Sequence, residues 1–446
     1  MIGIVMFLAA LLLLVIGFPV AFTFGAVALY FGLGAAYIEI VPDGGTMLEW
    51  WDEFLSMFSM MPFRIYSIMT NKILMAVPLF IFMGIVLQKS ELAERLLQSM
   101  GTLFGKVRGG LAISTVLIGA LLAASTGVVG ASVVAMGVIS LPIMLRNNYD
   151  SKLSCGTICA SGTLGQIIPP SIVLIVLADV FQLPVGDLFR AALMPGLVLV
   201  GVYVLYILTI SYIKPEVAPS VKRAEGVSYS ANLKTALIAI IPPLTLIVLV
   251  LGSIFAGIAT PTESASLGAL GSMILAAMYK KLSISLIKEA SLETVKTTAM
   301  VFAILVGATA FSMVFTYSGA DEIVEQFMTN LPGQKWGFII SAMLIIMFLG
   351  FFIDFIEISY IVVPILLPIA QTIGIDPLWF AILIALNLQT SFLTPPFGFS
   401  LFYLKGVAPP QIKTTDIYRG VVPFILLQML VLASIVIFPQ LYGFKV

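Results

Sequence analysis

The chain has 446 residues, of which 60% are hydrophobic and 10% are charged, and its 22 basic residues balance its 22 acidic residues. A soluble chain carries about 25% charged residues, so this composition excludes a soluble globular protein. It predicts an all-α polytopic membrane protein. The balanced charge argues against a nucleic-acid partner, and the complete lack of histidine removes the usual general base and a common metal ligand.

Apolar runs bounded by charged residues, Gly and Pro define the first half of the chain. The first run has no basic segment before it, so we expect a retained membrane helix rather than a cleaved signal peptide. The acidic and aromatic segment 38–65 is expected to be a loop. The block 109–145 has a polar centre, and Pro169-Pro170 interrupt a later run. The predicted membrane helices of this half cover residues 2–17, 19–37, 66–89, 153–181 and 191–213.

The basic segment 214–235 separates the halves and is expected to be a cytoplasmic linker. In the second half, the block 337–370 also has a polar centre, and Pro395-Pro396 interrupt the run 378–404. We expect both interrupted blocks to be re-entrant hairpins, although each is long enough to cross the membrane twice. The other predicted membrane helices cover residues 236–256, 262–279, 297–318 and 420–441.

The predicted topology therefore has about ten membrane helices and two re-entrant hairpins. With this arrangement, most lysine and arginine residues fall on the side that carries the linker. Because basic residues are enriched on the cytoplasmic side, the N-terminus and the C-terminus are both expected in the periplasm.

The two halves also match each other in sequence. Residues 140–144 (SLPIM) align with 366–370 (LLPIA), and 162–171 (GTLGQIIPPS) align with 388–397 (LQTSFLTPPF), both at an offset of 226 residues. Each half has an odd number of crossings, five helices plus one hairpin, so the halves should have opposite orientations. The sequence therefore predicts inverted repeats at 1–213 and 236–446, an arrangement typical of secondary transporters.

The paired prolines mark the places where chemistry can occur. Proline removes a backbone N–H and breaks the helix, and the freed carbonyl groups can bind a cation. Single Ser, Thr and Gly residues in membrane helices usually serve packing. Prolines beside polar residues in both halves favour a binding site instead. Intramembrane carboxylates such as Asp354 and Glu357 are functional candidates, although a hairpin tip in contact with water also explains them.

The segments 124–195, 257–270 and 393–398 together resemble the large membrane subunit, of the DctM type, of the tripartite ATP-independent periplasmic (TRAP) transporter family. The resemblance covers the full length. It implies a sodium-coupled importer of a small organic acid in the bacterial inner membrane, with an elevator architecture. It also implies two partners, a small membrane subunit and a soluble periplasmic binding protein. Sodium is the implied coupling ion, with no other metal and no cofactor.

The resemblance also assigns residues to sites. It implies a first sodium site of Ser125, Thr126, Gly162 and Thr163, and a second of Asp354, Thr394, Pro395 and Gly398. Gln166, Gln389 and Glu357 depart from the apolar or small residues expected there, which leaves the substrate open. The full set of candidate substrate- or cavity-lining residues is Ser132, Gln166, Pro169, Pro170, Glu357, Asn387, Gln389 and Thr390.

Two other functions compete with this interpretation. A stand-alone sodium- or proton-coupled dicarboxylate symporter of related fold would work without a binding protein. An intramembrane hydrolase would need a paired nucleophile and base, and without histidine only Asp354 and Glu357 remain as a pair. Inverted repeats with broken helices favour transport, so no enzyme activity and no catalytic residue are expected.

Overall fold

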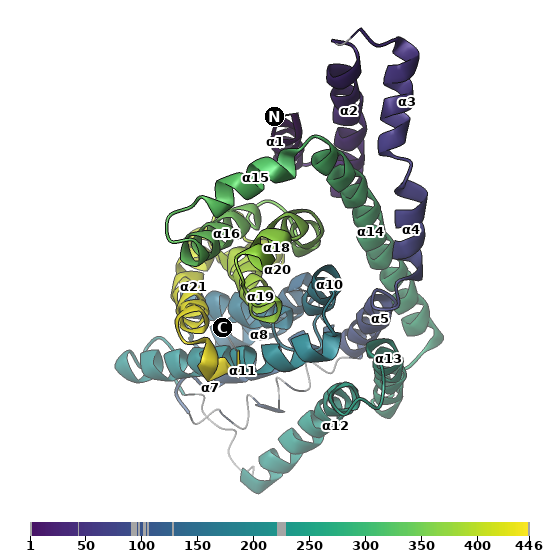
Figure 1. Ribbon diagram of the computed structural model, residues 1–446. Helices are drawn as coiled ribbons and strands as arrows, with labels where there is room; N and C mark the ends of the chain where they lie inside the picture. Colours follow the sequence, from purple (N-terminus) through teal and green to yellow (C-terminus); the bar gives the residue numbers. More distant parts are fainter. Residues whose placement is uncertain are drawn as a thin grey trace. The chain divides into compact units, whose positions relative to one another are not determined.

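The computed structural model describes residues 2–42, 44–90, 96, 99–100, 104, 107–126, 129–220 and 229–444, without the side chains of 123–126, 229–233 and 235. Every regular element in these ranges is a helix (Figure 1). Seven of these helices are long and apolar enough to cross a membrane. The described part of the chain is therefore all-α, as expected for a polytopic membrane protein. It divides into two compact units, which are described separately.

The first unit comprises Met1–Leu74 and Val295–Pro377. Its first two helices, α1 (Ile2–Ile16) and α2 (Val20–Ile40), pack against each other. The expectation of a loop over 38–65 is wrong, because α3 (Met47–Met57) and α4 (Met61–Thr70) form there. The Thr46 N–H donates to Glu49 Oε2 at 2.7 Å and closes a capping box at the start of α3.

The expected continuous helix over 66–89 is also wrong, because α4 ends at Thr70 and a new helix, α5, covers Ala76–Lys89. The physical cause is Asn71, whose side-chain Oδ1 accepts hydrogen bonds from the Ile73 and Leu74 N–H groups at 2.9 and 3.3 Å. Asparagine competes in this way with the helical backbone pattern and ends the helix.

The remainder of the first unit contains the second interrupted block. The C-terminal part of α14 (Ile284–Tyr317) leads into α15 (Ala320–Thr329) and α16 (Lys335–Leu349). The short helix α17 (Phe355–Glu357), a π-helical turn (Ile358–Val362) and α18 (Val363–Thr372) follow. The block is thus two helical arms with an interruption, as predicted, and α15 contacts both arms. Its re-entrant placement in a membrane stays a prediction.

The second unit comprises Met75–Thr294 and Leu378–Val446. Both predicted breaks at paired prolines lie in it, and so does the first interrupted block, which forms two helices, α7 and α8. Its helices are α5, α7 (Gly110–Thr126), α8 (Val129–Arg146), α9 (Ser151–Thr163), η1 (Leu164–Gln166), α10 (Ile172–Phe181), α11 (Val185–Ile213), α12 (Tyr229–Phe255), α13 (Pro261–Met278), α19 (Pro377–Leu393), α20 (Phe399–Val407), α21 (Thr414–Ile437) and η3 (Pro439–Tyr442).

Close backbone contact joins α9 to α21 in the second unit. A Cβ atom on Gly420 would collide with the carbonyl oxygen of Lys152 and lie 3.1 Å from the backbone nitrogen of Gly156. Glycine at these positions lets two helices approach closely, which is a common packing device in membranes. A buried hydrogen bond of 2.7 Å from Gln428 Nε2 to the Tyr203 hydroxyl connects α21 with α11.

Several predicted boundaries shift in the second unit. The helices α11 and α21 begin at Val185 and Thr414 rather than near 191 and 420. The helix α12 begins at Tyr229, inside the segment 214–235 that was expected to be a linker, and α14 begins at Ile284 rather than near 297. Lys89 Nζ of α5 pairs with Glu289 at 3.2 Å and Glu293 at 2.9 Å on the early turns of α14. The inverted repeats themselves stay a prediction.

Candidate functional site

The first broken helix runs from α9 through η1 to α10, with Pro169-Pro170 in the gap. Ser171 closes the gap in two ways. Its Oγ atom donates to the Gln166 carbonyl at 2.7 Å and accepts from the Leu174 N–H at 3.4 Å, which caps α10. One serine therefore satisfies backbone groups on both sides of the break.

The first interrupted block packs directly on this break. Both α7 and α8 contact α9 and η1. A Cβ atom on Gly162 would collide with the Val133 side chain of α8, and one on Gly119 of α7 would lie 2.9 Å from Ser161 Oγ. The structure thus packs α7 and α8 against the end of α9, which carries Gly162 and Thr163.

The structure describes the side chain of Thr163 in the first predicted site, but not those of Ser125 and Thr126. Thr163 is fully buried, and its Oγ1 atom donates to the Ala160 carbonyl at 2.9 Å. Ser125 and Thr126 form the last turn of α7, and their side chains lie outside the described part of the structure. Their predicted role as sodium ligands stays a prediction.

The second broken helix runs from α19 to α20, with Pro395-Pro396 between them. Thr394 Oγ1 donates to the Thr390 carbonyl at 2.7 Å, and Ser400 Oγ donates to the Phe392 carbonyl at 2.8 Å. Gly398 is closely surrounded by backbone, since a Cβ atom there would lie 2.7 Å from the Phe392 oxygen and 2.9 Å from the Thr394 oxygen.

The two carboxylates of the second interrupted block occupy different environments. Asp354 begins α17, and its Oδ1 atom accepts from the Phe355 N–H at 2.7 Å. Glu357 is 1% exposed, and within the described residues its Oε2 atom has no hydrogen-bond partner. Burying a carboxyl oxygen without a partner is unfavourable, so Glu357 is a candidate for a role beyond packing.

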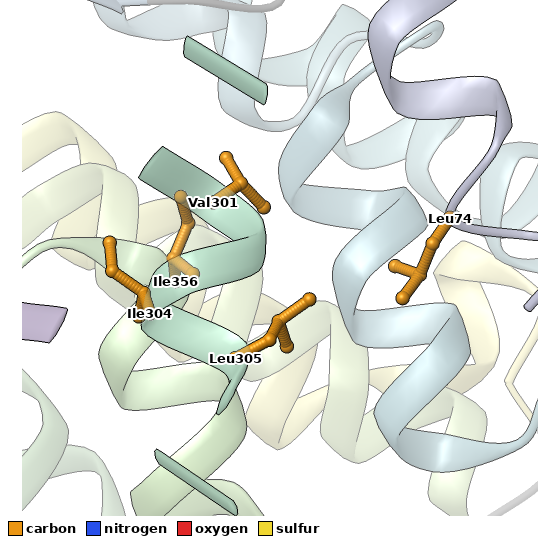
Figure 2. Close-up of a cluster of buried hydrophobic side chains, with 5 residues drawn as sticks. All are labelled: Leu74, Val301, Ile304, Leu305 and Ile356. Atoms are coloured by element: carbon orange, nitrogen blue, oxygen red, sulfur yellow. The ribbon is translucent and has the colours of Figure 1, made fainter. Parts of the chain in front are cut away.

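Apolar contacts hold this short helix in place. Ile356, which lies between the two carboxylates in sequence, is buried together with Leu74 and with Val301, Ile304 and Leu305 of α14. Figure 2 shows Ile356 beside the three α14 side chains. These contacts lie within the first unit. Asp354 belongs to that unit, and Thr394, Pro395 and Gly398 belong to the second. Their joint role as a sodium site stays a prediction.

Two glutamines stand out among the candidate lining residues. Gln166 and Gln389 are fully buried, and neither amide oxygen nor amide nitrogen has a hydrogen-bond partner within the described residues. By contrast, Thr390 Oγ1 donates to the Leu386 carbonyl at 2.9 Å. The remaining candidates in this unit are buried as well: Ser132, Pro169, Pro170 and Asn387.

Two residues beside the second break were not predicted. Ser400 closes the break through its bond to the Phe392 carbonyl, and the Tyr418 hydroxyl donates to the Pro396 carbonyl at 2.9 Å. Ser171 follows its proline pair directly, whereas three residues separate Pro396 from Ser400, so the two serines do not share one sequence spacing. Tyr418 lies 22 residues beyond Pro396, so sequence spacing gives no sign of its contact.

The breaks offer hydroxyl and carbonyl oxygens rather than a nitrogen or sulfur ligand set. Across the described residues, no group of three or more His, Cys, Asp or Glu side chains could hold a metal ion. Broken helices in transporters coordinate sodium with carbonyl groups of this kind. The chemistry of these residues therefore suits a weakly held alkali cation better than a transition metal.

Comparisons with known proteins agree with this geometry. The family described as "Tripartite ATP-independent periplasmic transporter, DctM component" matches residues 6–441. The chain is 31% identical over 377 residues to the C4-dicarboxylate TRAP transporter large permease protein DctM of Pseudomonas aeruginosa, covering 84% of this chain and 86% of that protein. It is 31% identical to the isethionate TRAP transporter permease protein DctMQ of Oleidesulfovibrio alaskensis, covering 94% of this chain but 62% of the relative.

A solved structure shares the fold. The crystal structure of the Alcanivorax borkumensis YdaH transporter superposes on 98% of this chain and 100% of its own, with a TM-score of 0.65. The identity is 14%, so this likeness concerns the arrangement of helices alone.

Proposed function

This chain belongs to the DctM-component family of tripartite ATP-independent periplasmic transporters, and from that premise we propose that it carries a small organic acid across the bacterial inner membrane together with sodium. Its N- and C-termini would lie in the periplasm, as the distribution of basic residues predicts. The relatives that it matches are permeases, so we propose transport and no enzymatic reaction.

One observation carries the proposal of sodium coupling. The second unit contains two helices broken at paired prolines, and the first break is packed against the helical pair α7 and α8. Irregular backbone is tolerated inside a membrane protein only where it is buried in protein or lines a cavity. In secondary transporters such breaks coordinate the coupling cation. We therefore assign sodium to the breaks around Thr163 and Thr394.

The charge of the substrate supports the same assignment. Organic acids are anions at neutral pH, yet the buried polar and charged residues of the described structure include no lysine and no arginine. An anion in this interior would then depend on bound sodium for its counter-charge and on neutral donors such as the Gln166 and Gln389 amides. This dependence is a physical reason for coupling, because the anion would bind poorly without the cation.

The proposed partners are a small membrane subunit and a periplasmic binding protein. The relative named as the isethionate TRAP transporter permease protein DctMQ is longer than this chain, which spans 62% of its length. We propose that the remainder of such relatives corresponds to a separate small subunit here. A tripartite system has a third component, which would deliver the organic acid from the periplasm.

We further propose an elevator mechanism. In such a mechanism, a domain that carries the ligand moves while a scaffold stays fixed in the membrane. The carrying domain would be built from both interrupted blocks and both helices that are broken at proline pairs.

The direct test is uptake into liposomes that contain this chain and its small subunit. We expect uptake of a radiolabelled organic acid only when sodium is present outside and the binding protein is supplied. Potassium in place of sodium serves as the control for ionic strength. Uptake that is equal in sodium and potassium would contradict sodium coupling, and uptake by this chain alone would favour a stand-alone symporter.

A further inference from the structure

A tyrosine from a neighbouring helix holds the loop of the second break. The Tyr418 hydroxyl, on the second turn of α21, donates a hydrogen bond of 2.9 Å to the carbonyl oxygen of Pro396. Pro396 lies in the gap between α19 and α20 and is exposed, whereas Tyr418 is half-buried. This bond therefore connects the loop to a separate element of the same unit.

Several further hydrogen bonds around this loop are local, and one leads to α9, where Cys159 Sγ donates to the Ser400 carbonyl at 3.7 Å. The Gly398 N–H donates to the Thr394 carbonyl at 3.0 Å, and Thr394 N–H donates to the Ser391 carbonyl at 3.1 Å. Ser400 Oγ reaches the Phe392 carbonyl from the start of α20. These bonds set the internal shape of the loop, but none of them fixes the loop against α21. Proline has no N–H to contribute, so a carbonyl is the backbone group that Pro396 offers to a partner.

The helix that carries Tyr418 is itself firmly placed. Ile417 and Gly420, on either side of it, are buried, and Gly420 lies against the backbone of Lys152 and Gly156 in α9. Because α9 ends in the first break, Tyr418 connects the loop of the second break to the helix that leads into the first.

The first half of the chain has no hydroxyl group at the position that matches Tyr418. The repeated pattern Asp187-Leu-Phe-Arg190 and Asp416-Ile-Tyr-Arg419 aligns Phe189 with Tyr418. Phe189 is fully buried and carries no hydroxyl group. The additional hydroxyl thus occurs in the half whose break has an exposed loop, and not in the half whose break is buried.

We propose that Tyr418 is a positioning residue for the second cation site, a role that rests on the proposed sodium coupling. It holds the Pro395-Pro396 loop so that the oxygens around Thr394 and Gly398 are preorganised for sodium. Without the hydroxyl, the same oxygens remain but must be ordered when the cation binds, and ordering of this kind weakens affinity. The loss of one hydrogen bond should raise the sodium concentration for half-maximal binding about three- to tenfold.

The test uses Tyr418→Phe, which retains the ring and introduces the residue that the first half carries at this position. Tyr442→Phe is the matched control, because the Tyr442 hydroxyl makes a hydrogen bond of 2.6 Å with Ser434 at the other end of α21. The melting temperature of the complex with the small subunit is measured across a sodium titration, with choline added to keep ionic strength constant.

We expect Tyr418→Phe to shift the midpoint of the sodium titration while its melting temperature in choline alone stays close to that of the wild type. A purely structural role would lower the melting temperature in both media and leave the midpoint unchanged, which would overturn the proposal. An equal shift in Tyr442→Phe would overturn it too. If the wild-type protein itself shows no sodium-specific response, sodium coupling fails and the role of Tyr418 fails with it.

Discussion

The two helix breaks of the second unit both contain a proline pair but have different surroundings. In the first break, Gly162, Thr163, Gln166 and Ser171 are all buried, and α7 and α8 pack against them. In the second break, Thr394 and Pro395 are half-buried, and Phe397 is 45% exposed. Repetition of a sequence pattern therefore reproduces the break itself but not the way in which it is stabilised.

The hydrogen bonds that close the breaks differ accordingly. Ser171 alone both bridges the first gap and caps α10. The second gap uses Ser400 for the bridge and Tyr418 for attachment to another helix. A buried loop is held by the packing around it, whereas an exposed loop needs specific hydrogen bonds to keep one conformation. The substitutions below test whether packing holds the first break and hydrogen bonds hold the second.

The largest effect is expected from Gly398→Ala in the second break. The new methyl group would lie within 3.0 Å of three backbone atoms of Phe392 and Thr394, and backbone cannot move aside as a side-chain end can. We expect destabilisation of about 1–3 kcal/mol and a loss of transport of at least tenfold, measured by thermal unfolding and liposome uptake. Gly406→Ala in α20 is the control, since nothing lies within 4 Å of its Cβ position. Wild-type uptake by Gly398→Ala would contradict the structure of this loop.

The next largest effect should come from Gln166→Met and Gln389→Met. A buried amide without partners costs about 1–3 kcal/mol, so a similarly sized apolar side chain should raise the melting temperature. Transport should fall by about tenfold or more if the amides bind the organic acid. The control Gln428→Met should raise the melting temperature less or lower it, because it removes the hydrogen bond to Tyr203 together with an amide oxygen that has no partner within the described residues. A stabilised Gln166→Met variant with normal uptake would show that this amide has no contact with the substrate.

A smaller difference should separate Ser171→Ala from Ser400→Ala. Ser171→Ala loses both a bridging bond and a helix cap, about 1–2 kcal/mol in total, whereas Ser400→Ala loses one bond, about 1 kcal/mol. Thermal unfolding of the two variants in sodium-free buffer measures this order. If Ser400→Ala is more destabilised than Ser171→Ala, the predicted order is wrong, and the serine contributes more to the stability of the second break than to that of the first.

The sequence predicts the two breaks from their proline pairs. Pro169-Pro170 and Pro395-Pro396 both lie in gaps between helices, whereas Pro242-Pro243 lie inside the continuous helix α12. A proline pair therefore favours a break without requiring one, and the polar residues beside the first two pairs are the additional signal. The helix α3 was missed, although Thr46 and Glu49 form a capping box that is readable in the sequence. Its mixture of acidic and aromatic residues concealed the helical pattern.

Other features depend on contacts between distant residues. Nothing local shows that Tyr418 reaches Pro396, or that the Gln166 amide is buried without a partner. The close approach of Gly156 and Gly420 likewise depends on how α9 and α21 pack. The sequence therefore indicates which backbone segments are irregular, whereas the structure is needed to show which distant side chains contact them.

The most direct measurement is the melting temperature of the complex in sodium against equal potassium, for the wild type and for Thr163→Ala. A ligand that binds only the folded state at one hundred times its Kd stabilises by about 2.7 kcal/mol. We predict a sodium-specific rise that is lost in Thr163→Ala and retained in Thr115→Ala, whose Oγ1 atom makes a similar bond to the Leu111 carbonyl at 2.9 Å. Equal melting temperatures in both salts, or an unchanged sodium response in Thr163→Ala, would contradict the assignment of sodium to the first broken helix.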